Sequence, residues 1–407
     1  MKGKKILALC VFLLASCESK KIDSSIISIN SFESISNNSS LVDQSSDDQD
    51  NSILVNSSEE IKKQKKNLIL FVGDGMRNNH VTSYSYLAKK NAAFLNFKSC
   101  QVDTNCLSKD FYPNLLTDSA ASATAMATGE LISYRYVGKD KDGNDLTTIF
   151  DVAQKLNYKT GILTTDKLYD ATPAGFSSHS LDRGNTDEIA LGQALSGIDY
   201  LCGLTSTRYL TKYNQNFIDQ GYAISSSESE MNQVIENDKV LLQYDLVGGG
   251  ETLHFKDAVD NALTFLTKDK DQPFILLAEQ AHIDKESHSN NFEGMISNMK
   301  ELDEGVSLAL DFASKNHNTV IMIAADHETG SLDLSFEENS LYQEYVYPET
   351  NQKIYYHFGY TGHTNKTVGL YTYGYDVDYS KYDFYFNPSI VKNTNVYDIM
   401  YDVITEN

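Results

Sequence analysis

Four short apolar segments constrain the fold of this chain more than any other feature of its sequence. They are residues 68–72, 160–163, 274–278 and 320–324. Short, mainly apolar runs are typical of strands that are buried on both faces of a sheet. Segments with a helical pattern lie between them, at residues 146–156, 256–266 and 295–313. This alternation predicts an α/β fold, doubly wound, with a mainly parallel central sheet and helices on both faces.

Acidic residues follow three of the predicted strands. Asp74, Glu279 and Asp326 come within two residues of the ends of the first, third and fourth segments. In open α/β sheets, ligands bind beside the carboxyl ends of the strands. The three carboxylates therefore indicate a candidate site at that edge of the sheet.

A stretch of small residues, 115–129, carries a second candidate. Asp118 and Ser119 precede an alanine-rich run that favours helix and that Gly129 would end. A serine at a helix N-terminus lies where backbone N–H groups and the helix dipole attract an anion. On these residues alone, an N-cap on a buried helix of small residues is the better interpretation.

Five stretches in fixed order resemble the alkaline phosphatase family, from about residue 67 to the C-terminus. In chain order they are Phe71-Val-Gly-Asp-Gly-Met76, Asp118-Ser119 with its alanine-rich run, Asp170-Ala-Thr-Pro-Ala174 with Arg183, Glu279-Gln-Ala-His-Ile-Asp-Lys-Glu-Ser-His288, and Ala325-Asp-His-Glu-Thr-Gly330 with Gly362-His-Thr364. The resemblance implies the fold of that family and hydrolysis of phosphate monoesters.

Metal binding is part of what the resemblance implies. A mixture of carboxylates and imidazoles suits Zn²⁺. The resemblance assigns one zinc ion to Asp284, His288 and His363, and a second to Asp326 and His327 with Asp74 and Ser119. It assigns a magnesium ion, which prefers oxygen ligands, to Glu279 and Thr172, with Asp74 bridging and Asp170 acting through water.

The remaining roles concern the phosphate. By resemblance, Ser119 is the nucleophile that forms a phosphoserine. Arg183 binds two phosphate oxygens through two parallel N–H groups. Asp118 orients the Arg183 side chain. Lys285 is expected to bind substrate, and its combination with Asp170 resembles the version of the family whose third ion is Mg²⁺.

Three positions depart from the family pattern. Arg77 stands where glycine is usual, and Gln280 and His282 stand where small residues are common. His282 fits a packed histidine best, with a metal ligand or a substrate contact as alternatives.

The N-terminal sequence predicts an export signal followed by a tether. Residues 1–16 have a lysine-rich start and a short apolar core, and Leu14-Ala-Ser-Cys17 resembles a bacterial lipobox. We expect a lipoprotein signal peptide, lipidation of Cys17, and anchoring on the extracellular face of the cell membrane. An ordinary signal peptide is the alternative. Residues 17–66 are rich in Ser, Asn and Asp and predict a disordered tether, followed by a catalytic domain over residues 67–407.

Charge and cysteines limit the partners. The formal net charge of −22 argues against nucleic acid, whose binding needs clustered Lys and Arg, and against membrane contact other than through the anchor. The expected partners are small phosphate monoesters, and the resemblance also suggests a homodimer. Cys100 and Cys106 could form a disulfide, which the sequence does not decide.

Two other functions compete with a lipid-anchored phosphomonoesterase. A phosphodiesterase or sulfatase could use the same two-metal fold, although Arg183 and the magnesium residues suit a phosphoryl group with three free oxygens. A solute-binding lipoprotein would share the lipobox and tether, but it would not need Ser119 within a full metal set.

Overall fold

The computed structural model describes residues 65–107, 116–205, 207–225, 234–245, 254–382 and 390–406. The predicted signal peptide, Cys17 and residues 17–64 of the predicted tether lie outside these ranges. Among the described residues, no helix has the length and apolar composition needed to cross a membrane. No disulfide joins Cys100, Cys106 and Cys202 in the part of the chain that the structure describes.

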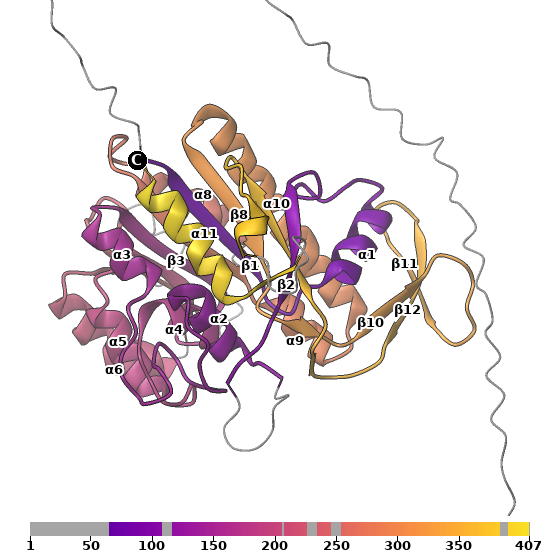
Figure 1. Cartoon of the computed structure of the whole chain (residues 1–407), viewed down its shortest axis with the longest axis horizontal. Helices are drawn as coiled ribbons and strands as arrows, with labels where there is room; N and C mark the ends of the chain where they lie inside the picture. The colour runs from indigo at the N-terminus through magenta and orange to yellow at the C-terminus, as the bar shows by residue number, and fades with distance from the viewer. Residues whose placement is uncertain are drawn as a thin grey trace, which may run out of the picture. The chain divides into compact units, whose positions relative to one another are not determined.

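A ten-stranded sheet forms the centre of the molecule (Figure 1). Within this sheet as the structure describes it, β14 alone runs antiparallel to its neighbours, β8 and β2. In order across the sheet the strands are β15 (Ile390–Lys392), β2 (Lys98–Asp103), β14 (Val368–Tyr373), β8 (Thr319–Ala324), β1 (Asn67–Gly73), β7 (Phe274–Gln280), β3 (Lys159–Lys167), β4 (Tyr200–Thr205), β6 (Val240–Asp245) and β5 (Ala223–Ser225).

The four apolar segments form the middle of this sheet as predicted. Strands β8, β1, β7 and β3 lie side by side and parallel. Every residue of β1, β7 and β8 is buried. Buried strands of this kind have no polar face, which explains why their sequences are continuous apolar runs rather than alternating ones.

Helices cover both faces of the sheet. On one face, α8 (Phe255–Leu266) and α10 (Phe292–Lys315) pack on each other and on β7. On the other, α11 (Thr394–Thr405) packs on β1, on α2 (Ser119–Thr128) and on α3 (Ile149–Lys155), and α2 packs on α4 (Ala171–Ser177). In Figure 1, α11 crosses in front of the central strands. The predicted doubly wound α/β fold is confirmed.

One predicted helix starts later than expected. The segment at residues 146–156 is helical only from Ile149, because Thr148 and Asp151 form a reciprocal capping box. A capping box satisfies the first free N–H groups of a helix and so fixes where it begins.

The remaining elements lie around this core. They are α1 (Asn78–Ala88), α5 (Thr186–Leu195), α6 (Thr207–Asp219), α9 (His282–His288), the 3-10 helix η2 (Tyr379–Tyr382), a sheet of β10 (Leu332–Ser335), β12 (Lys353–Phe358) and β11 (Gln343–Val346), and a ribbon of β9 (Glu328–Thr329) and β13 (His363–Thr364). The ribbon pairs His363 with Thr329 and so places the C-terminal motif beside the end of β8.

Candidate active site

Three carboxylates meet at the carboxyl edge of the central strands. Strand β1 lies between β7 and β8, with Val72 level with Glu279 on one side and with Ala324 on the other. Asp74 follows β1, Glu279 is the last residue but one of β7, and Asp326 follows β8. All three side chains are buried. In Figure 1, helices α2, α4 and α9 lie at this same edge.

Ser119 is the first residue of α2 and lies at this edge. Asp118 is the N-cap, and its Oδ1 accepts a hydrogen bond from the Ala121 N–H at 3.2 Å. Every residue of α2 is buried, and Gly129 ends the helix with a φ of 75°. Small side chains allow this burial, because α4 approaches so closely that a Cβ on Gly175 would lie 2.9 Å from the Thr124 nitrogen.

Asp284, His288 and His363 form the first candidate metal cluster. The His288 Nε2 lies 3.2 Å from the His363 Nε2 and 3.3 Å from the Asp284 Oδ1. Each imidazole donates its Nδ1–H to a carbonyl oxygen, His288 to Thr361 at 2.6 Å and His363 to Thr117 at 2.9 Å. The two Nε2 atoms are therefore unprotonated in the neutral rings and face each other. A cation between them removes the repulsion of their lone pairs and explains the arrangement.

Asp74, Asp326 and His327 form the second cluster, beside Ser119. The His327 Nε2 lies 3.1 Å from Asp326 Oδ2, 3.1 Å from Ser119 Oγ and 3.6 Å from Asp74 Oδ1. The buried atoms Asp74 Oδ1 and Asp326 Oδ2 have no hydrogen-bond donor within the described residues. Buried carboxylate oxygens are rarely left unsatisfied, so this donor set also fits a metal ion.

The two clusters are adjacent and electrostatically linked. The rings of His327 and His363 stack at 3.5 Å between centroids. Burial raises the pKa of Asp74 well above its ordinary value, and repulsion from Asp326, Asp284 and Glu279 raises it further. Burial and the neighbouring His327 lower the pKa of His363 to about 4.

Glu279 marks a third position, rich in oxygen. Its Oε2 accepts a hydrogen bond from Thr164 Oγ1 at 2.5 Å. The Thr172 Oγ1 is buried near this carboxyl and has no partner at hydrogen-bonding geometry within the described residues. Burial raises the pKa of Glu279 to about 8. An oxygen-only set of this kind fits Mg²⁺ better than Zn²⁺.

Arg183 is held between two carboxylates on the open side of the site. Its Nη1 donates to Asp118 Oδ2 at 3.2 Å, and its Nη2 donates to Asp170 Oδ1 at 3.0 Å. Lys285 Nζ donates to the other Asp170 oxygen at 3.0 Å. The side chains of Arg183 and Lys285 are 24% and 40% exposed, so both remain accessible to a ligand.

The alkaline phosphatase family model matches residues 65–207 and 229–386 of the chain. The chain belongs to the alkaline phosphatase family. Alkaline phosphatase 3 of Bacillus subtilis is 30% identical to it over 66% of this chain and 62% of its own length. The alkaline phosphatase of Escherichia coli K12 is 28% identical over 66% of this chain and 71% of its own length.

Solved structures agree with the family assignment. The alkaline phosphatase from the Antarctic bacterium TAB5 superimposes with a TM-score of 0.70 and 26% identity, over 85% of this chain and all of the other. The matches to alkaline phosphatases 3 and 4 of Bacillus subtilis span only 62% and 63% of those proteins.

Within this alkaline phosphatase fold, the residues singled out in the sequence come together. The two metal clusters, Ser119 and the Asp118–Arg183–Asp170–Lys285 chain occupy one edge of the sheet. His282, the first residue of α9, is half-buried, and burial lowers its pKa. It belongs to neither of the two groups of close potential metal ligands in the described residues, which are Asp284, His327 and His363, and Asp74, Asp326 and His327.

Several supporting residues of the site were missed by the sequence analysis. Thr329 Oγ1 donates to Asp284 Oδ1 at 2.5 Å and so accepts the Nδ1–H of His327 at 3.2 Å, which leaves the His327 Nε2 free to bind a metal. Thr164 and the buried Asp166 come from the end of β3. The predicted strand stopped at residue 163, and nothing in a threonine or aspartate beyond it indicated that it faces the site.

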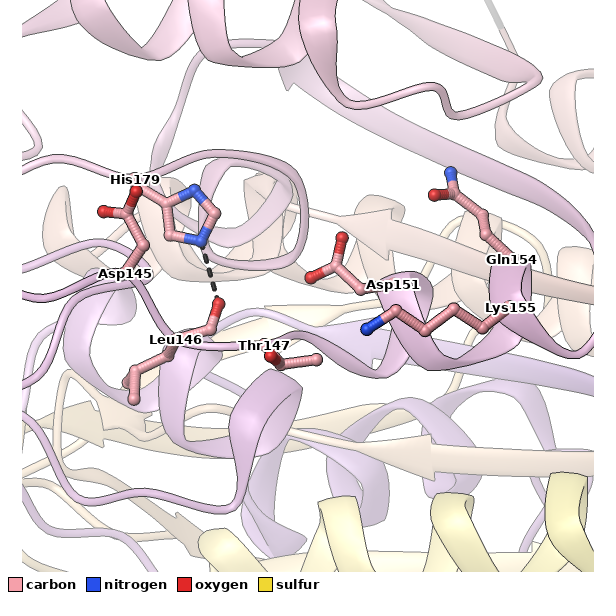
Figure 2. Close-up of a pocket in the computed structure, with 7 residues that line it drawn as sticks. All are labelled: Asp145, Leu146, Thr147, Asp151, Gln154, Lys155 and His179. Carbon is pink, nitrogen blue, oxygen red and sulfur yellow. Dashed lines mark hydrogen bonds between the residues drawn. The ribbon is translucent and has the colours of Figure 1, made fainter.

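A surface depression away from this site is lined by Asp145, Leu146, Thr147, Asp151, Gln154, Lys155 and His179 (Figure 2). The His179 Nε2 donates to the Leu146 carbonyl at 2.9 Å, which fixes the ring. None of the residues that line the depression belongs to the metal clusters.

Proposed function

We propose that this protein hydrolyses phosphate monoesters to an alcohol and inorganic phosphate through a phosphoserine on Ser119. The observation that carries the proposal is the position of the Ser119 Oγ. It lies at the start of a buried helix and 3.1 Å from the Nε2 of His327, which is itself part of a donor set fit for a metal ion. Family membership supports the same activity.

Charge alone requires cations in this reaction. The site contains two cationic side chains, Arg183 and Lys285, and seven carboxylates, namely Asp74, Asp118, Asp166, Asp170, Glu279, Asp284 and Asp326. A phosphate dianion would be repelled by this excess of negative charge. We propose that Asp284, His288 and His363 hold one zinc ion, and that Asp74, Asp326 and His327 hold a second with Ser119. Bound ions would supply positive charge that lowers the pKa of the serine hydroxyl and attracts phosphate.

We propose a magnesium ion at the third position, held by Glu279 and Thr172 with Asp74 bridging and Asp170 acting through water. A variant of TAB5 alkaline phosphatase, 25% identical with a TM-score of 0.69, has Mg bound in its M3 site. The oxygen-only donors around Glu279 support the same choice here.

The protein's own residues carry the chemical steps. The Ser119 Oγ attacks phosphorus, an Oγ–P bond forms, and the bond from phosphorus to the alcohol oxygen breaks. Water then attacks the phosphoserine, which breaks the Oγ–P bond and releases phosphate. Arg183, oriented by Asp118 and Asp170, binds two phosphoryl oxygens throughout. Lys285 adds a positive charge on the solvent side.

The test uses the full chain and p-nitrophenyl phosphate, with and without a chelator. We expect turnover that the chelator abolishes, two zinc ions and one magnesium ion per chain, and an acid-stable phosphoenzyme. Ser119→Ala should retain metal and lose the phosphoenzyme, because six other side chains are proposed to hold the zinc ions. A phosphoenzyme trapped on Ser119→Ala, or metal-loaded protein without turnover, would contradict the proposal.

The competing functions give different results in the same assays. A phosphodiesterase or sulfatase would prefer bis-p-nitrophenyl phosphate or p-nitrophenyl sulfate. A solute-binding protein would bind phosphate without turnover. Small phosphate monoesters are the substrates that we propose.

We also propose a homodimer, which analytical sedimentation would test.

We further propose that Cys17 is lipidated and anchors the protein on the extracellular face of the cell membrane. The motif Leu14-Ala-Ser-Cys17 after a short apolar core supports this proposal. Cys17→Ser should release the protein from the membrane fraction. A mature N-terminus at another residue, seen by mass spectrometry, would refute the anchor.

A further inference from the structure

Asp166 is a buried carboxylate that the proposed reaction leaves without a role. It lies near the carboxyl end of β3 and is 3% exposed. Its Oδ2 forms an ion pair with the Nζ of Lys285, and its Oδ1 lies 3.9 Å from the Nζ of Lys167. A carboxylate buried to this degree is costly unless it is paired, so Lys285 is the partner that accounts for its position.

Lys285 is therefore shared between two carboxylates. Its Nζ pairs with Asp166 on one side and with Asp170 on the other, the latter at 3.0 Å. Asp170 in turn accepts from Arg183, which also pairs with Asp118. The result is a chain of alternating charge that runs from Asp166 to the N-cap of the helix that carries Ser119.

The side chain of Thr165 joins the two segments that carry Asp166 and Lys285. The Thr165 Oγ1 donates to Gln280 Oε1 at 2.7 Å and accepts the Ala281 N–H at 3.0 Å. These bonds join the end of β3 to the turn that leads into α9, the helix that carries Lys285. The fold therefore holds Asp166 and Lys285 close to each other, because the end of β3 and the start of α9 are joined by these hydrogen bonds.

We propose that Asp166 is a positioning residue that holds Lys285 against Asp170 and weakens the attraction of Lys285 for a phosphate dianion. The inference rests on the proposed phosphatase function and deepens it. One ammonium between two carboxylates gives a group with one net negative charge, whereas Lys285 with Asp170 alone would be neutral. Phosphate is therefore bound less tightly in the presence of Asp166. Weaker product binding favours the release of inorganic phosphate after each turnover.

The test compares phosphate affinity in Asp166→Asn and the parent, both metal-loaded. Affinity is measured as the inhibition constant of inorganic phosphate during hydrolysis and, independently of turnover, by calorimetry. We expect phosphate to bind Asp166→Asn about 3- to 10-fold more tightly, the effect of one nearby charge in a partly screened site. We expect kcat to fall as product release slows.

Two further variants isolate the role of Lys285. In a Lys285→Gln background, Asp166→Asn should change phosphate affinity less than about twofold, because the two residues act as one unit. Asp199→Asn is the matched control. Asp199 pairs with Lys159 at the amino end of β3, the strand that carries Asp166, and the loss of the Asp199 charge should leave phosphate affinity unchanged.

If Asp166→Asn does not fold, as judged by circular dichroism, Asp166→Ser takes its place.

The outcomes separate this inference from the proposed function. A parent protein without turnover contradicts the phosphatase proposal and, with it, this inference. A parent protein with turnover whose phosphate affinity is unaltered by Asp166→Asn contradicts this inference alone. An equal effect of Asp166→Asn with and without Lys285 also overturns it, since Asp166 would then act as a distant charge.

Discussion

The position of single atoms explains why the proposed phosphate site needs cations. Asp74 Oδ1 and Asp326 Oδ2 are buried without a donor among the described residues, and the Nε2 atoms of His288 and His363 face each other at 3.2 Å. Each arrangement is unfavourable alone, and one cation in each cluster would relieve it. Arg183 differs, because its guanidinium is already satisfied on one side by Asp118 and Asp170. Its remaining N–H groups are available to a ligand.

Replacement of Arg183 tests this difference. Arg183→Ala should raise the inhibition constant of inorganic phosphate by about 10- to 100-fold, less than the loss of a sole oxyanion donor, because metal ions share the stabilisation. Arg135→Ala is the control, since Arg135 pairs with Asp182 beside the site. It should change phosphate affinity far less. Equal phosphate affinity in Arg183→Ala and the parent would remove Arg183 from the binding site.

At the scale of elements, α9 carries two of the proposed metal ligands. Asp284 and His288 lie four residues apart on it and face the same cluster, as the sequence spacing predicts. The buried His80 on α1 forms a hydrogen bond with α9. Its Nδ1 accepts the Arg77 N–H at 3.0 Å, so its Nε2–H donates to Ser287 Oγ at 3.3 Å. Burial lowers the pKa of His80 to about 4, which keeps the ring neutral.

The hydroxyl of Thr329, on β9, bonds to the proposed metal ligands Asp284 and His327 and gives a second prediction. Thr329→Val removes the hydrogen bonds to Asp284 and His327 while nearly keeping the volume of the side chain. We expect zinc affinity, measured by competition with a chromogenic chelator, to fall about 10-fold, the usual effect of losing an outer-shell partner. Thr372→Val is the matched control, because the Thr372 hydroxyl is equally buried but bonds to Tyr379. Unchanged zinc affinity in Thr329→Val would show that the hydroxyl does not orient the ligands.

At the scale of the whole molecule, the sheet brings together carboxylates that repel one another, and this repulsion affects folding. Burial raises the pKa of Glu279 from its ordinary 4.5 to about 8, and Asp74 shifts in the same direction. The folded protein therefore holds protons that the unfolded chain has already released. Stability from this source is present at low pH and is lost as pH rises toward and through 8.

Chelator-treated protein should accordingly become less stable between pH 7 and 8.5. The expected fall is at most about 1.4 kcal/mol per pH unit for each such group. His80 and His363 do not interfere, since their lowered pKa values place their titration below this range. Metal-loaded protein should lack the fall, because cations then compensate the carboxylates. Urea denaturation at several pH values measures both, and a rise in the stability of the chelated protein over this range would contradict the argument.

The sequence by itself determined the central sheet and the edge at which the site lies. Continuous short apolar runs such as residues 274–278 are typical of strands buried on both faces, and acidic residues at their ends indicate the ligand-binding edge. The start of α2 at Ser119 and its end at Gly129 also follow from local preferences. These features depend on neighbours in the chain, so they can be predicted from short segments.

Only the tertiary structure decided what holds each functional group in place. The carbonyls of Thr117 and Thr361 fix the two imidazoles, and Asp166 shares Lys285 with Asp170. Each of these contacts joins residues that are far apart in sequence. They are hydrogen bonds and ion pairs whose existence depends on distances of about 3 Å, and such distances are set by the packing of the sheet, α2 and α9 together. No pattern in a single segment encodes them.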